Sequence, residues 1–169
     1  GASVDETMNP AGTQLWVSIE GIGARRFSFR DEPRPDAGHV TDALAKRGFG
    51  LTLLSGDVED EVIRVASDLH IDDARGAQRP ADKIAALEAL GEAGARILMV
   101  GDGLNDAPAL RAASVSMSPS TAADVSQVAA DFIFQGRSLL PVLEAIDVAR
   151  KSRRLVLQNF ALAALYNSI

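Results

Sequence analysis

The segment 101–106 reads Gly-Asp-Gly-Leu-Asn-Asp and brings two carboxylates and one amide together within five residues. Oxygen donors of this kind suit Mg²⁺, which binds one or two carboxylates together with waters and phosphate oxygens. The apolar run 97–100 directly before the segment is typical of a buried strand, so the loop should lie at the carboxyl end of that strand. We expect Asp102 to bind the metal directly and Asp106 to support it through a water molecule. A solvated acidic turn is the alternative.

A hydroxyl group follows a second apolar run, 51–54, in the turn Ser55-Gly56-Asp57. A serine at a strand end, beside a helix N-terminus, can donate to a phosphoryl oxygen. An equally good interpretation is that Ser55 or Asp57 caps the helix that follows. Lys83 stands in the first turn of a predicted helix, where a cation opposes the helix dipole. It could balance phosphate and carboxylate charge there, or lie solvated on the surface.

Short apolar runs alternate with helical patterns of about ten residues or more, which is typical of a parallel sheet flanked by helices. Aliphatic side chains carry most of the apolar content, since aromatic residues make up only 5%. We therefore expect an α/β fold. The expected strands are 15–19, 26–29, 49–54, 97–100, 115–117 and 132–134; the expected helices are 36–46, 58–69, 80–93, 121–129 and 138–165, with another near Pro108.

Composition excludes several kinds of site. The chain of 169 residues has no cysteine, so it holds no disulfide, thiolate zinc site or cysteine nucleophile. Its two histidines, His39 and His70, are isolated and predict no histidine-based metal centre. The net charge of −6 argues against a nucleic-acid partner, because phosphate contacts need clustered Lys and Arg.

Taken together, these loops resemble the phosphorylation domain of the P-type cation-transporting ATPases. The run 101–110 closely resembles the hinge motif of that family, and the turn at Ser55 is similar to its Thr-Gly-Asp, with serine replacing threonine. Pro80 and Lys83 match its Pro-x-x-Lys. The segment where the family's chain re-enters this domain is matched by Asp31, Arg34, Pro35, Asp36 and Ala37. The resemblance covers residues 15–169 and implies a haloacid-dehalogenase-like fold.

The resemblance also implies roles for the loop residues. Asp102 would bind Mg²⁺, with Asn105 and Asp106 organising the site, while Ser55 and Lys83 would hold the phosphoryl group transferred from ATP. Four further residues would shape the phosphate loops: Gly56, Asp57, Gly101 and Gly103.

The sequence departs from the family at the nucleophile. The family's phosphorylated aspartate sits in Asp-Lys-Thr-Gly-Thr, which is absent; the nearest string, 5–9, lacks the glycine and a preceding strand. We therefore expect the nucleophile upstream in a longer parent protein, a sheet without the strand that carries it, and a chain unable to phosphorylate itself. The exposed strand edges would favour a domain-swapped or strand-paired dimer.

Three divisions are expected: a hairpin remnant of the nucleotide-binding domain (1–30), the phosphorylation domain (31–150) and the start of a membrane helix (151–169). Four basic residues within 150–154 precede an apolar stretch, as on the cytoplasmic flank of a membrane helix. A basic patch on a surface helix is the alternative. The stretch is shorter than the roughly 20 apolar residues that span a bilayer, so we expect the helix to continue beyond it.

The end of the chain resembles the membrane helix of the heavy-metal (P1B) class. Copper members of that class carry a Tyr-Asn pair in the transport pathway, so Tyr166 and Asn167 are candidate ligands of transported Cu⁺. The stretch 117–124 resembles the FixI/CcoI branch, which supplies copper for a cbb-type cytochrome oxidase. Pro119 and Ser120 could instead be ordinary turn residues.

The expected function follows from this resemblance. We expect a cytoplasmic region of a copper transporter of the bacterial inner membrane, with the transporter's remaining domains as its partners. The alternatives are a stand-alone phosphatase of the same superfamily and a non-catalytic module that binds Mg²⁺ or phosphate.

Overall fold

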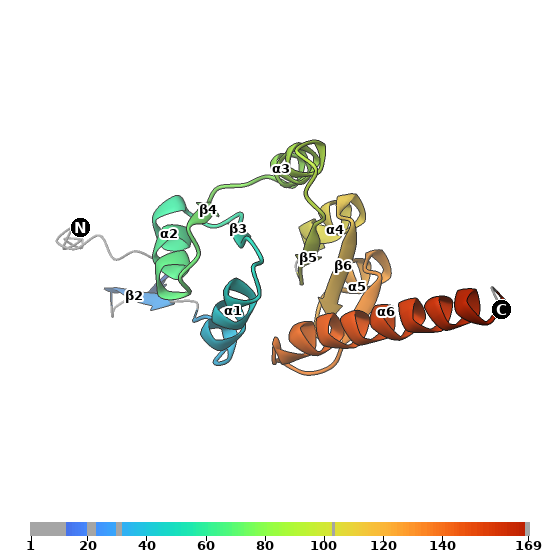
Figure 1. Cartoon of the computed structure of the whole chain (residues 1–169). Helices are drawn as coiled ribbons and strands as arrows, with labels where there is room; N and C mark the ends of the chain where they lie inside the picture. The colour runs from blue at the N-terminus through green and yellow to red at the C-terminus, as the bar shows by residue number, and fades with distance from the viewer. Residues whose placement is uncertain (1–12, 20–22, 30–31, 103, 168–169) are drawn as a thin grey trace.

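The computed structural model of the chain describes residues 13–19, 23–29, 32–102 and 104–167. An antiparallel hairpin of β1 (Thr13–Ile19) and β2 (Gly23–Phe29) comes first. The elements that follow are α1 (Ala37–Lys46), β3 (Thr52–Leu54), α2 (Glu59–Asp68), β4 (Asp73–Arg75), α3 (Pro80–Glu92), β5 (Leu98–Val100), the 3₁₀ turn η1 (Leu104–Asp106), α4 (Ala107–Ala112), β6 (Val115–Pro119), α5 (Asp124–Ala129), β7 (Phe132–Phe134) and α6 (Leu140–Asn167) (Figure 1).

The parallel strands form two separate sheets. β3 pairs with β4, and β5, β6 and β7 form a second sheet in that order. In Figure 1 the first sheet lies with α1 and α2, the second lies with α4, α5 and α6, and α3 stands above the space between them. The predicted α/β fold with parallel strands flanked by helices is confirmed. In the described part of the chain, β3 and β5 each have one edge without a partner strand.

The core lies between the second sheet and α6. Met117 of β6, Phe134 of β7 and Val142 of α6 are buried together, and Leu98 and Ile146 pack against them. On the opposite side, α4 contacts both α3 and α5. This packing fixes the carboxyl end of β5, where the loop 101–106 begins.

The start of α6 is held by a carboxylate from a distant segment. Asp36 Oδ2 accepts hydrogen bonds from Ser138 Oγ at 2.6 Å and from the backbone N–H groups of Leu139 at 2.6 Å and Leu140 at 3.2 Å. Burial by itself raises the pKa of Asp36, but these hydrogen bonds outweigh it and hold the pKa below its ordinary value of 3.8. Asp36 therefore caps α6, although in sequence it precedes α1.

The end of α1 also contacts α6. Arg47 donates to the backbone oxygen of Leu143 at 3.5 Å and forms a 3.0 Å ion pair with Asp147. The guanidinium of Arg150 lies 5.3 Å from the ring centroid of Phe49, within cation–π range. The first half of α6 thus packs on the second sheet and is also bound to the end of α1.

Several elements differ from the sequence prediction: β1 and β2 begin earlier, β6 ends later, and α6 is shifted by two residues. Three further differences have a specific structural reason. β4 was not expected, because Asp-Ala-Arg has no apolar run, and it forms as a strand only through pairing with β3. The strand expected over 49–54 shortens to β3, since Phe49 lies outside the sheet against Arg150. The helix expected over 121–129 begins at Asp124, because residues 120–122 form a turn in which the Ala122 N–H donates to Pro119 O.

The second half of α6 extends beyond the sheet (Figure 1). Its large apolar side chains are exposed, namely Leu155, Val156, Leu157, Phe160, Leu162 and Leu165. Within the residues that the structure describes, we find no helix whose length and apolar content would suffice to cross a bilayer.

Candidate functional site

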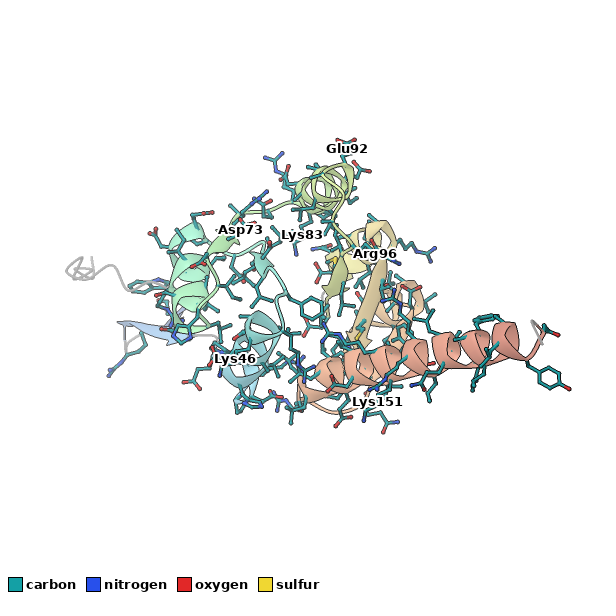
Figure 2. The ribbon with its side chains drawn as sticks, viewed as in Figure 1. Lys46, Asp73, Lys83, Glu92, Arg96 and Lys151 are labelled. Carbon is teal, nitrogen blue, oxygen red and sulfur yellow. The ribbon has the colours of Figure 1, made fainter. Side chains whose placement is uncertain are left out.

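A lysine–aspartate pair joins α3 to the loop that follows β5. Lys83 Nζ donates a 2.6 Å hydrogen bond to Asp106 Oδ1, and the two side chains are only 11% and 13% exposed. Figure 2 shows Lys83 on the side of α3 that faces α4 and β5. The interpretation of Lys83 as a solvated surface residue is therefore wrong, because tertiary packing of α3 against α4 encloses it.

Gly101 lets the backbone approach this pair. A Cβ atom at residue 101 would lie 3.1 Å from Cβ and 3.2 Å from Oδ2 of Asp106, closer than side chains normally pack. The Gly101 N–H donates to Met117 O at 3.2 Å, which extends the β5–β6 ladder to the start of the loop. Asp102 is thus the first residue beyond the sheet, next to the Lys83–Asp106 pair.

Asp102 is bound by an arginine that the sequence analysis did not assign to the site. Arg34 Nη2 lies 3.0 Å from Asp102 Oδ2, and Arg34 Nη1 donates to the backbone oxygen of Arg137 at 2.8 Å. The Asp102 side chain remains 61% exposed, while that of Arg34 is 26% exposed. Two signals were present in the sequence, the position of Arg34 between two prolines and its place in the segment that matches the family, but neither indicates a partner 68 residues away.

The Ser55 turn makes its own set of hydrogen bonds. Ser55 Oγ donates to Asp57 Oδ2 at 2.7 Å and accepts from the Asp57 N–H at 3.3 Å. Neither residue caps α2, whose N-cap is Val58 without a side-chain bond, so the capping interpretation is wrong. The backbone oxygens of Ser55 and Asp57 accept from Gln78 at 2.8 Å and Ala77 at 2.6 Å. The turn is thereby attached to the segment that leads into α3 and Lys83.

The structure brings some of the predicted residues together and leaves others apart. Gly101 and Asp106 gather with Lys83, and Asp102, the residue after Gly101, pairs with Arg34. Among the described residues, the hydrogen bonds of Ser55 reach residues 57, 75 and 78 but not this group. Gly56 and Asp57 lie in the same turn, Asn105 is exposed in η1, and Gly103 lies outside the described residues.

The two residues predicted to bind the transported ion lie elsewhere. Tyr166 is 82% exposed, and Asn167 Nδ2 donates to Ala163 O of the preceding turn at 2.8 Å. Both stand at the far end of α6, away from the loop that follows β5 (Figure 1).

The donor set near Lys83 suits a hard cation. Among the described residues, no three carboxylate or imidazole side chains gather closely enough to hold a metal by themselves. Mg²⁺ needs fewer protein ligands, because it retains waters and takes phosphate oxygens. Asp102 offers an exposed carboxylate, and Asp106 offers a second that is already paired with Lys83. These residues fit Mg²⁺ bound chiefly at Asp102.

Comparisons with known proteins relate this arrangement to a family of hydrolases and to metal-transporting ATPases. Residues 9–114 match the family model "haloacid dehalogenase-like hydrolase". The chain is 52% identical over 147 residues to the nitrogen fixation protein FixI of Bradyrhizobium diazoefficiens, an alignment that covers 86% of this chain and 20% of that protein. It is 34% identical over 170 residues to the copper-transporting ATPase 1 of Rattus norvegicus, covering 98% of this chain and 11% of that protein.

A solved structure shows the same arrangement of elements. The crystal structure of a zinc-transporting PIB-type ATPase matches with a TM-score of 0.74 and 28% sequence identity, over 81% of this chain and 24% of that chain. The chain spans about a fifth of the length of FixI and about a tenth of that of the rat ATPase.

Proposed function

Because the chain belongs to the haloacid dehalogenase-like hydrolase family and, within it, to the heavy-metal P-type ATPases, we propose that it forms the Mg²⁺-binding part of the phosphorylation domain of an ATP-driven copper transporter. The observation that carries this proposal is the enclosed Lys83–Asp106 pair beside Gly101 and Asp102. In a solvated acidic turn Asp106 would be exposed, whereas here it is 13% exposed and paired with an ammonium group that a phosphate site could use.

The residues of this chain would share the work of holding a phosphoryl group. Lys83 would donate to a phosphoryl oxygen, and its low exposure strengthens that charge interaction. Asp106 would keep the ammonium oriented, and the Ser55 hydroxyl would donate once it leaves Asp57. Asp102 would hold Mg²⁺, which when bound neutralises charge on the phosphate.

The nucleophile would come from a segment outside these 169 residues. In the described part of the chain, β3 and β5 each expose an edge, so one inserted parallel strand could join the two sheets. The carboxyl end of that strand would lie beside the loops of Ser55 and Asp102. Its aspartate oxygen would form a bond to the γ-phosphorus of ATP as the bond to ADP breaks, and water would later hydrolyse the aspartyl phosphate.

The same proposal extends to the rest of the parent protein. The exposed apolar half of α6, preceded by Arg150, Lys151, Arg153 and Arg154, would lead into a bilayer, with this region on the cytoplasmic side of the bacterial inner membrane. Tyr166 and Asn167 would then lie within the membrane as ligands of the transported Cu⁺. The hairpin of β1 and β2 would belong to the nucleotide-binding domain.

The experiment is phosphorylation by radiolabelled ATP. In the full-length transporter, Lys83→Ala and Asp102→Asn should abolish the copper-dependent phosphoenzyme, whereas Lys46→Ala, an exposed control on α1, should retain it. The 169-residue chain alone should acquire no covalent phosphate. Label on the isolated chain, or an undiminished phosphoenzyme in Lys83→Ala, would contradict the proposal. Turnover of a generic phosphate ester by the isolated chain would favour a stand-alone phosphatase.

A further inference from the structure

Three segments that are distant in the sequence meet at one guanidinium group. Arg34 lies in the chain that leads into α1, Asp102 follows β5, and Arg137 lies between β7 and α6. Arg34 uses two different nitrogens for its two partners, Nη2 for the Asp102 carboxylate at 3.0 Å and Nη1 for the Arg137 carbonyl at 2.8 Å. The planar, forked shape of the guanidinium makes this double contact possible, and lysine could not reproduce it.

At Asp102 the guanidinium stands where a metal ion would have to compete with it. The Asp102 carboxylate is 61% exposed, so solvent and ions reach it, but one of its oxygens already carries a cation. Mg²⁺ that binds this carboxylate must either displace Arg34 or share the group with it. Either way, the positive charge of Arg34 opposes the ion, by an amount of the order of one exposed ion pair.

Through its second guanidinium nitrogen, Arg34 is connected to the segment that leads into α6. Arg34 holds the Arg137 carbonyl, and Asp36, two residues further on, accepts hydrogen bonds from Ser138, Leu139 and Leu140. A movement of the Arg34 side chain therefore acts directly on the backbone that enters α6.

We propose that Arg34 is a positioning residue that occupies Asp102 as its counter-ion until Mg²⁺ displaces it. We propose also that it connects the loop 101–106, called here the metal loop, to the first turn of α6. This inference rests on the proposed Mg²⁺ site at Asp102. It adds to that site a competing charge and a physical connection to the helix that leaves the domain.

The test is a MgCl₂ titration of the ¹⁵N-labelled chain, followed through backbone amide resonances. Arg34→Gln should bind Mg²⁺ about fivefold more tightly than the wild type, since the opposing charge is gone. Arg96→Gln is the matched control, because Arg96 is exposed at the amino end of β5 and Asp102 follows its carboxyl end (Figure 2). Its affinity should equal that of the wild type.

The second readout separates positioning from charge. In the wild type, Mg²⁺ should shift the amides of Leu139 and Leu140 together with those of the metal loop. Arg34→Lys keeps the charge but loses the fork, so its affinity should stay near the wild-type value while the shifts at Leu139 and Leu140 vanish. This variant keeps the test decisive even if Arg34→Gln fails to fold.

Three results would overturn the inference, and they differ in what else they overturn. If the wild type shows no saturable response to Mg²⁺, the proposed metal site and the role of Arg34 fail together. If the wild type binds Mg²⁺ but Arg34→Gln binds it no more tightly than Arg96→Gln, or Arg34→Lys transmits the shifts unchanged, only the role of Arg34 fails.

Discussion

Lys83 and Asp106, one in the first turn of α3 and the other at the end of η1, form a 2.6 Å ion pair that is largely withdrawn from solvent. Each charge is tolerated at this depth because the other is present. The pair therefore fixes the loop 101–106 against α3. Replacement of either partner should lower both the free energy of unfolding and the affinity for phosphate.

Replacement of the lysine should destabilise the fold. Lys83→Met removes the ammonium group and leaves Asp106 without this partner, at a cost of about 1–3 kcal/mol. In the double variant with Asp106→Asn, the total loss should be smaller than the sum of the two single losses. Urea unfolding measures all three, with the exposed Lys151→Met as the control. Additive losses would show that the two residues do not interact in solution.

An alanine in place of Gly101 should destabilise the chain, whereas an alanine in place of Gly91 should stabilise it. Gly101→Ala forces Asp106 away by a few tenths of an ångström and should lower both the free energy of unfolding and Mg²⁺ affinity. Gly91→Ala, within α3, meets nothing within 4 Å and should stabilise by about 1 kcal/mol through helix propensity. Thermal unfolding distinguishes the two. Stabilisation by both substitutions would argue against close packing at residue 101.

Removal of the exposed carboxylate should abolish metal binding without unfolding the chain. Asp102 lies in a loop outside the sheet, so Asp102→Ala should keep the wild-type circular dichroism spectrum. Its amide resonances should no longer respond to MgCl₂, whereas those of the exposed control Asp60→Ala should respond as in the wild type. An unchanged titration in Asp102→Ala would place the metal elsewhere.

The cap on α6 should make stability depend on pH. The pKa of Asp36 is lower in the folded chain than its ordinary value of 3.8. The Asp36 carboxylate therefore stabilises the fold fully above pH 3.8, and this stabilisation is lost as the pH falls through the pKa of the folded chain. Asp36→Asn should be about 1 kcal/mol less stable at neutral pH and should lose less on acidification. Urea midpoints across this range measure both effects. The exposed Asp72→Asn should keep the wild-type profile.

The free edge of β5 should allow chains to associate. The Gly101 N–H donates to Met117 O and the Val115 N–H donates to Ile97 O, so in a regular parallel ladder the Val100 N–H points to the opposite edge. Val100→Pro removes that donor and should keep the β5–β6 pairing intact. Light scattering should show a dimer of the wild type and a monomer of the variant. A wild type that stays monomeric at all concentrations would contradict strand pairing.

The sequence predicted those features that depend on local patterns. The helices and most strands follow from apolar periodicity, and the loop 101–106 follows from its own composition. β4 could not be predicted, because its residues become a strand only through β3. Arg34 was missed because its partner is 68 residues away, and Asp36 was expected to begin α1 whereas its carboxylate bonds the start of α6. The burial of Lys83 likewise could not be predicted, because it depends on the packing of α3 against α4 and not on the residues next to it in the sequence.

The Asp36 carboxylate and Arg34 hold one end of a helix of 28 residues. At 1.5 Å per residue that helix is about 42 Å long, and about 30 Å of it extends beyond Asp147, where Arg47 also holds it. A rotation of the anchored part by about 5° beside Asp102 would therefore displace the far end of the helix by about 3 Å, roughly half of one helical turn.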